Sequence, residues 1–248
     1  MTHGNGKVGI IPAAGLASRI GGIPKFLLPC GDDGEFLLRR LQRQMFDAGI
    51  GDHIVPTRTD SRDVVRRGLM GRHRLMVVET ATMAETVLKC RDEAGNRDCY
   101  FGMPDGYIAN HDVFSHLALD MADWRQSEAL AILALVRTRY DQRGKLGMVS
   151  AGYNESRQIM QVFDVVDKDA ECGLSWAWVA MAWRPAFWRY IKPEMPHVGY
   201  AVKAAIDDGQ TITARLFNSQ YWDCGTFDEY GRLVEYIRRS EMVVSDGA

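Results

Sequence analysis

The sequence lacks the features that mark a disulfide framework, a zinc site or a membrane span. Its five cysteines are an odd number without a C-x-x-C pair, which argues against both a disulfide framework and a zinc site. Its six histidines form neither an H-E-x-x-H nor an H-x-x-E-H pattern, which argues against a zinc hydrolase. No apolar run approaches the roughly 18 residues of a membrane span, and the first residues do not resemble a signal peptide. We therefore expect a globular protein of the reducing cytoplasm.

An excess of charge of one sign is also missing. Of the 248 residues, 30 are Lys or Arg and 32 are Asp or Glu, so the formal net charge is −2. Without a basic excess, nucleic acid is not an expected partner. An anionic small molecule would have to be held by a few local cations rather than by a broad positive field. The sequence leaves a homo-oligomer open.

Strand and helix patterns alternate over about the first 140 residues. The expected strands are residues 8–15, 52–57, 75–80 and 129–138, together with a strand in residues 98–108 that runs into a polar turn. The expected helices are residues 35–50, 60–71, 83–95 and 111–126. This alternation predicts right-handed βαβ units and a mostly parallel sheet. Several of the strands are almost continuously apolar, which indicates a sheet that is covered on both faces.

The pattern changes after about residue 140. Strands are expected at residues 145–153, 158–168, 174–183 and 212–218, and helices at residues 185–191, 198–209 and 227–242. The first three of these strands have no long helix between them, which predicts antiparallel or mixed pairing. No linker or internal repeat interrupts the chain. We therefore predict a single domain over residues 1–248, with a Rossmann-like three-layer α/β/α architecture and a mostly parallel mixed sheet.

Small residues and two cations follow the first expected strand. In open α/β sheets, ligands bind beyond the carboxyl ends of the strands, so the residues at these ends are the candidates for chemistry. Ala13, Ala14 and Gly15 let the backbone approach a ligand closely, and successive N–H groups there could cradle phosphate oxygens. Arg19 and Lys25 could then supply charge to a polyphosphate. The alternative is a plain turn with two solvated cations, and this turn fits neither G-x-G-x-x-G nor the P-loop pattern.

Three further polar groups follow strands. Asp105 lies in a Pro-Asp-Gly turn, where ordinary turn chemistry is the alternative. Asp167 and Lys168 end a later strand, where the lysine could reach a phosphate or simply be solvated. Asp223 lies between a tryptophan and a Cys-Gly-Thr turn. Two separated aspartates with nearby cations suit Mg²⁺, which commonly takes one or two carboxylates and substrate phosphate oxygens.

Taken together, these residues give the sequence a resemblance to the sugar-phosphate nucleotidyltransferases, the NDP-sugar pyrophosphorylase-like family. That family carries G-G-x-G-T-R and then P-K, for which residues 13–19 and 24–25 stand here. Its Asp after the fourth strand resembles the "MPDG" of residues 103–106. Its V-x-E-K-P and W-x-D-x-G-T elements resemble "VVDKD" at residues 165–169 and "YWDCGT" at residues 221–226. The motifs keep the family's order from residue 8 to about residue 230.

The resemblance implies the nucleotidyltransferase fold and an enzyme that transfers an NMP from an NTP to a sugar 1-phosphate. The products would be an NDP-sugar and pyrophosphate, and the cofactor would be Mg²⁺. The first half, about 1–140, would bind the nucleotide and the second half, about 141–248, the sugar phosphate. The implied residues are Arg19 and Lys25 for catalysis, Asp105 and Asp223 for the metal, Lys168 and Asp167 for the sugar phosphate, and Ala13, Ala14, Gly15, Leu16, Thr80, Met83 and Thr86 for the nucleotide.

The family pattern is not matched everywhere. Ala17 replaces the later glycine, and the step from Arg19 to Pro24 is short, closer to cytidylyltransferases of the isoprenoid and phosphocholine types and to molybdopterin guanylyltransferases. Thr86 matches a family threonine, but Glu85 replaces the small residue before it. A cytidylyl- or guanylyltransferase for a non-sugar phosphorylated acceptor therefore stays an alternative, as does a catalytically silent nucleotide-sugar-binding protein. A nicotinamide-dependent oxidoreductase would need a G-x-G-x-x-G turn after its first strand, which is lacking.

Overall fold

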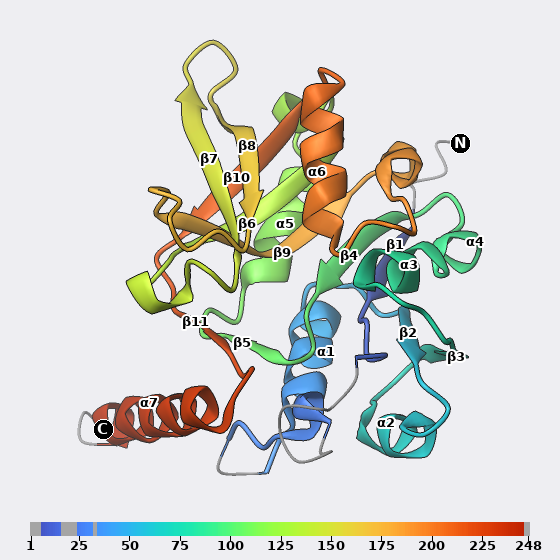
Figure 1. Ribbon diagram of the computed structural model, residues 1–248, viewed down its shortest axis with the longest axis vertical. Coiled ribbons are helices and arrows are strands. Elements are labelled where there is room, and N and C mark those ends of the chain that lie inside the picture. The colour runs from blue at the N-terminus through green and yellow to red at the C-terminus, as the bar shows by residue number, and fades with distance from the viewer. Residues whose placement is uncertain (1–5, 16–23, 32–33, 246–248) are drawn as a thin grey trace.

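The computed structural model describes residues 6–15, 24–31 and 34–245 (Figure 1). Within these ranges, nine strands form one sheet in the order β3-β2-β1-β4-β9-β6-β10-β8-β7, and β5 and β11 form a separate two-stranded ribbon. The strands are β1 (Lys7–Ile10), β2 (His53–Thr57), β3 (His73–Val77), β4 (Asp98–Gly102), β5 (Gly106–Ile108), β6 (Ala131–Arg137), β7 (Gly147–Asn154), β8 (Ile159–Asp167), β9 (Trp176–Trp183), β10 (Ile212–Phe217) and β11 (Tyr221–Asp223).

Strand directions confirm the predicted mixed sheet. Strands β3, β2, β1 and β4 are parallel to one another, and β10 is parallel to β6. Strand β9 lies between these two groups and is antiparallel to both β4 and β6. Strands β7, β8 and β9 pair antiparallel, as expected for the segments after residue 140. The carboxyl ends of β1 to β4 therefore lie at one edge of the sheet.

Helices cover both faces of the sheet, which confirms the predicted three layers. The α-helices are α1 (Leu37–Asp47), α2 (Arg62–Gly68), α3 (Met83–Leu88), α4 (Arg91–Ala94), α5 (Val113–Ala122), α6 (Val198–Asp207) and α7 (Phe227–Ser245), and the short 3₁₀ helices are η1 (Lys25–Leu27), η2 (Trp124–Gln126), η3 (Tyr140–Gln142) and η4 (Pro185–Tyr190). One core contains residues of α3, α4 and α6, and the other contains residues of α1, α2 and α5. Strand β6 supplies alternate residues to each, such as Leu133 to the first core and Ile132 to the second.

Two expected elements are divided in the structure. The expected helix at residues 83–95 is split into α3 and α4, because the N–H of Cys90 bonds to Val87 O at 2.9 Å and so tightens the last turn of α3. In residues 98–108, strand β4 runs into the expected polar turn after Gly102, and the chain then continues as a second strand, β5, which pairs with β11 outside the main sheet. No helix in the described ranges combines the length and apolar composition needed to cross a membrane.

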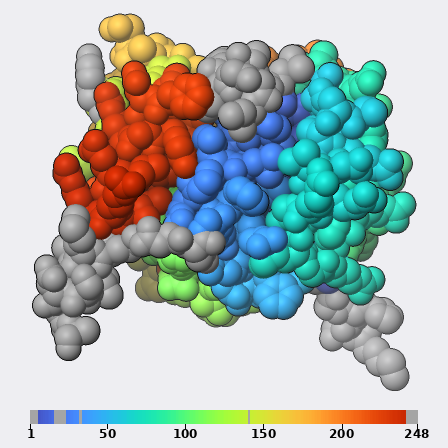
Figure 2. Space-filling view, turned by 90° about the horizontal axis from the view of Figure 1, so that it is seen from below, coloured from blue at the N-terminus to red at the C-terminus, as the bar shows by residue number. Residues whose placement is uncertain are grey.

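Helix α7 holds the β5–β11 ribbon against the segment that contains α1. A small third core joins Leu37 of α1 to Trp222 of β11 and Leu233 of α7. The hydroxyl of Tyr230 donates to Pro29 O at 2.7 Å. Figure 2 shows the C-terminal helix and the segment around α1 side by side on one face of the molecule. The ribbon is thus fixed by residues from both ends of the chain.

A glycine at the end of β4 sets how closely two helices approach the sheet. A Cβ on Gly102 would lie 2.7 Å from Leu41 Cδ1 and 3.0 Å from Phe114 Cζ. We expect Gly102→Ala to lower the free energy of unfolding by about 1–3 kcal/mol, because it overpacks the core between α1 and α5. Chemical denaturation measures the effect. Gly51→Ala is the control, since its Cβ would have no heavy atom within 4 Å, and equal losses in both variants would contradict this account.

Candidate functional site

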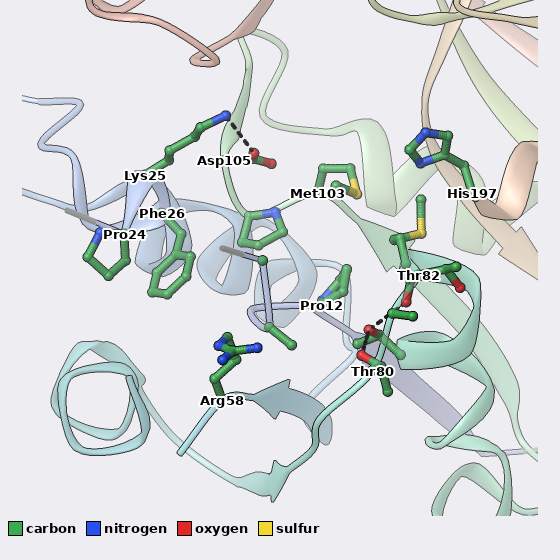
Figure 3. A pocket seen from close by; sticks show the side chains of 16 residues that line it. Pro12, Pro24, Lys25, Phe26, Arg58, Thr80, Thr82, Met103, Asp105 and His197 are labelled. Atoms are coloured by element: carbon green, nitrogen blue, oxygen red, sulfur yellow. Dashed lines mark hydrogen bonds and ion pairs between the residues drawn. The ribbon is translucent and has the colours of Figure 1, made fainter. Parts of the chain in front are cut away.

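A cavity of about 430 Å³ opens at the edge of the sheet where β1 to β4 end (Figure 3). Residues that closely follow each strand line it. Ala14 comes after β1, Arg58 after β2, Thr80 after β3 and Asp105 after β4. Because these strands are parallel, the residues beyond their carboxyl ends share one crevice, which is where open α/β sheets bind ligands.

Most of the residues expected to bind the nucleotide lie at this cavity. The predicted residues that line it are Ala14, Gly15, Lys25, Thr80, Met83, Thr86 and Asp105. Ala13 is fully buried and does not line the cavity, but it fixes the start of the loop: its N–H donates to Pro56 O at 2.9 Å, and its carbonyl accepts from Thr57 Oγ1 at 3.3 Å. Leu16, Ala17 and Arg19 lie outside the described residues.

The β5–β11 ribbon brings the two predicted metal ligands together. Asp223 lies opposite Gly106, the residue after Asp105, and the N–H of Cys224 donates to Asp105 O at 3.2 Å. Lys25 Nζ lies 3.9 Å from Asp105 Oδ2. Asp223 does not itself line the cavity and lies beside it on β11. Asp105 and Lys25 thus lie at one end of the cavity, and Asp223, from a distant part of the chain, lies next to them.

Negative charge is concentrated around Asp223. The pKa of this carboxyl is raised from 3.8 to about 6, first by burial and then by the neighbouring Asp105 and Glu229, while Lys25 and Lys145 act in the opposite direction. Glu229, in the first turn of α7, is itself buried. It accepts from the ammonium of Lys145 and, at 3.2 Å, from a neighbouring threonine hydroxyl. An added cation would offset the charge that these three carboxylates place together.

The arrangement of Asp105 and Asp223 fits Mg²⁺. Both are hard oxygen donors beside an open cavity that could admit water and phosphate oxygens. In the part of the chain that the structure describes, no group of three or more His, Cys, Asp and Glu residues is arranged as a metal site. The fit is therefore to an ion that takes one or two carboxylates and completes its coordination with water and substrate, as Mg²⁺ commonly does.

The threonine hydroxyls at the start of α3 donate their hydrogen bonds to other groups of the protein. Thr86 Oγ1 donates to Thr82 O at 2.9 Å, so Thr80 must be the donor in its 2.6 Å hydrogen bond to Thr86 Oγ1. Thr82 Oγ1 donates to Pro193 O at 2.7 Å. These hydroxyls can therefore only accept hydrogen bonds from a ligand.

Glu85, which replaces a small family residue, caps α3. Its backbone N–H donates to Thr82 Oγ1 at 3.0 Å, and its carboxylate accepts from the N–H of Ala81 at 2.8 Å. This exchange is close to a capping box, in which two otherwise unpaired N–H groups at a helix start are satisfied reciprocally. The departure from the family pattern thus has a local structural role.

A histidine that lines the cavity contacts the two residues predicted to bind the sugar phosphate. Lys168 and Asp167 do not line the cavity, but His197 does, and its Nε2 lies 2.6 Å from Lys168 Nζ and 3.7 Å from Asp167 Oδ2. Burial lowers the pKa of His197, with Lys168 acting in the same direction and Asp167 opposing it. The neutral ring can accept a hydrogen bond from the Lys168 ammonium. Lys168 has a φ of 54°, a left-handed conformation that is rare outside glycine and is concentrated at functional sites.

Arg58, His197 and Glu229 are polar residues of the site that the sequence analysis did not identify. Arg58 directly follows β2, so the rule that pointed to Asp105 applied to it equally. His197 and Glu229 gave no spacing signal, because their polar neighbours include Lys168 and Lys145 from distant segments.

Comparison with solved structures confirms the predicted fold. No model of a protein family and no curated protein sequence matches this chain. A UDP-glucose pyrophosphorylase complexed with UDP-glucose superposes with a TM-score of 0.79 at 16% identity, over 95% of this chain and 99% of that one. The UTP-bound enzyme from Acinetobacter baumannii gives 0.74 at 16% identity, over 96% and 98%. A putative glucose-1-phosphate thymidylyltransferase from Bacillus anthracis gives 0.74 at 19% identity, over 94% and 95%.

The raised pKa of Asp223 predicts that its charge destabilises the metal-free protein. The native carboxyl, with a pKa of about 6, holds its proton more tightly than the unfolded one at 3.8, so the free energy of unfolding falls as pH rises from about 4 to about 6. We expect Asp223→Asn to raise the free energy of unfolding by up to about 3 kcal/mol at pH 8 in EDTA. The gain should disappear below about pH 4. Denaturation at several pH values measures it, with the exposed Asp228→Asn as control. A gain independent of pH would contradict the electrostatic explanation.

Proposed function

We propose that this protein is a Mg²⁺-dependent nucleotidyltransferase that converts an NTP and a sugar 1-phosphate into an NDP-sugar and pyrophosphate. The observation that carries the proposal is the meeting of Lys25, Asp105 and Asp223 at the end of a cavity beyond four parallel strands. Structures of the same fold, in complex with UTP and with UDP-glucose, support it. The five free cysteines are compatible with a cytoplasmic enzyme.

The chemistry asks the protein mainly for positioning and for charge neutralisation. A phosphate oxygen of the acceptor attacks the α-phosphorus of the NTP, and the bond from that phosphorus to the pyrophosphate leaving group breaks. The attacking oxygen is already anionic, so a general base is not needed. Bound to Asp105 and Asp223, Mg²⁺ would neutralise charge on the transferring phosphate. Lys25 and, by family resemblance, Arg19 would stabilise the triphosphate.

The side chains on the walls of the cavity suit parts of the two substrates. The threonine wall of residues 80–86 accepts hydrogen bonds and could therefore face the N–H groups of a base. His197 lies next to this wall, since the N–H of Met83 donates to Pro196 O at 3.3 Å, and it connects the cavity to Lys168 and Asp167 of the second half, where an acceptor phosphate could be held. A catalytically silent binding protein is less well supported, since a pure binder has little use for two adjacent carboxylates at the cost in stability that burial implies.

A substrate panel tests the proposed reaction. Each NTP is combined with sugar 1-phosphates and with other phosphorylated acceptors, with and without Mg²⁺, and released pyrophosphate is measured. We expect release that requires Mg²⁺, one preferred NTP and a sugar 1-phosphate. Turnover confined to a non-sugar acceptor would favour the cytidylyl- or guanylyltransferase alternative. NDP-sugar binding without turnover would favour the silent protein.

The paired carboxylates are expected to be essential for turnover. Asp105→Asn or Asp223→Asn should lower kcat by at least about 100-fold. Without one of its ligands, Mg²⁺ would no longer neutralise the negative charge on the transferring phosphate. The same steady-state assay measures this effect, and circular dichroism checks folding. Asp228→Asn, at an exposed position of α7, should keep wild-type turnover. Wild-type rates in both site variants would overturn the metal assignment.

Lys168 is expected to act on the acceptor rather than on the nucleotide. Lys168→Met should raise the KM for the acceptor by about tenfold and leave the KM for the NTP unchanged, because one charge-assisted hydrogen bond to phosphate is lost. Lys192→Met is the control, since Lys192 is exposed and outside the cavity. Equal changes in both KM values would place Lys168 outside acceptor binding.

A further inference from the structure

Arg58 is a cation at the cavity that the family resemblance does not explain. It lines the cavity directly after β2, whereas Lys25 and Asp105 lie at the end formed by the ribbon. Figure 3 shows Lys25 and Arg58 well separated, with Phe26 between them in this view and with Thr82 and His197 across the cavity. Lys25 and Arg58 are the two permanent cations among the described residues that line it.

The backbone places Arg58 beside the loop that follows β1. Ala13 and Thr57 form a parallel bridge, so the residues that follow them, Ala14 and Arg58, leave the sheet side by side. Thr57 is held from both sides, because its Oγ1 donates to Ala13 O at 3.3 Å and its carbonyl accepts from the N–H of Val78 at 2.8 Å. The base of the Arg58 side chain is therefore fixed against the loop.

The described residues offer the Arg58 guanidinium few competing partners. Its Nε lies 3.5 Å from Asp60 Oδ2, but the Asp60 side chain is 71% exposed, so this ion pair contributes little. The same Nε is shielded from solvent and makes no hydrogen bond to any residue that the structure describes. Lys25, in contrast, already faces Asp105. Arg58 thus keeps hydrogen-bonding capacity for a ligand in the cavity.

We infer that Arg58 binds the β- and γ-phosphates of the NTP and the pyrophosphate that leaves. This inference rests on the proposed function and adds a residue to it. A triphosphate with a bound Mg²⁺ still carries negative charge, and Lys25 shares its own charge with Asp105. A guanidinium fork can donate two parallel hydrogen bonds to phosphate oxygens, which an ammonium cannot. Arg58 would thus hold the leaving group on the side of the cavity away from the carboxylates.

Calorimetry with ligands that differ in their phosphates tests this role. The ligands are Mg²⁺–pyrophosphate, the preferred NTP with Mg²⁺, and the corresponding NMP. We expect Arg58→Gln to raise the Kd for pyrophosphate and for the NTP by at least about tenfold, because hydrogen bonds to a charged group are lost. The Kd for the NMP should not change. Arg58→Lys keeps the charge without the fork and should fall between. Arg66→Gln, on the exposed face of α2, should bind like the wild type.

The outcomes separate the two proposals. If the wild-type protein binds neither NTP nor pyrophosphate, the proposed function fails and this inference fails with it. If the wild type binds both and Arg58→Gln binds them equally well, the inference alone is overturned. A variant that loses NMP affinity while keeping pyrophosphate affinity would show that Arg58 contacts the nucleoside, which also overturns it. Thermal unfolding of each variant shows whether it is folded. If Arg58→Gln does not fold, an Arg58→Lys protein that is folded and binds pyrophosphate more weakly than the wild type still supports the inference.

Discussion

The pairing of β5 with β11 is the constraint on which the rest of the site depends. It places Asp223 opposite Gly106 and so next to Asp105, at the end of a cavity that four parallel strands form. Neither strand belongs to the main sheet. The ribbon is held instead by a small core with α1 and α7, which explains why the last helix lies outside the three layers. A helix at the end of the described chain thereby helps to set the spacing of the two carboxylates.

This arrangement has an electrostatic cost that the fold only partly relieves. Asp223 is desolvated beside Asp105 and Glu229, and its raised pKa reports how unfavourable the ionised state is. Lys145 neutralises Glu229 directly, and Lys25 lies near Asp105, but no cation among the described residues forms an ion pair with Asp223. In a site that binds a cation, a buried carboxylate without a protein cation beside it is expected. The same charges that weaken the metal-free protein therefore favour the binding of a metal ion.

The sequence was sufficient to predict the three layers and the candidate residues at the strand ends. It was not sufficient to predict the contacts between distant segments. Alternating patterns predicted the βαβ units because each strand and helix is fixed locally by its own periodicity. The rule that ligands bind beyond strand ends found Asp105 and Gly15, and it applied to Arg58 as well. His197 could not be found in this way, because it lies before α6 and gains its role only through Lys168 and Asp167. The split of the helix at residues 83–95 was also missed, since it depends on one hydrogen bond, from the N–H of Cys90 to Val87 O, that spans three residues instead of four.

Departures from the family pattern differ in their physical meaning. Glu85 caps α3, so its difference from the family is explained by the backbone N–H groups that it satisfies and says nothing about the base. The threonines around it are more informative, because their protons are committed within the protein and only acceptor positions are left for a ligand. Arg58 differs again, since its Nε makes no hydrogen bond to a described residue and its ion pair is with the exposed Asp60. A side chain whose hydrogen-bonding capacity the fold leaves unused beside a cavity is better explained by a ligand than by the fold itself.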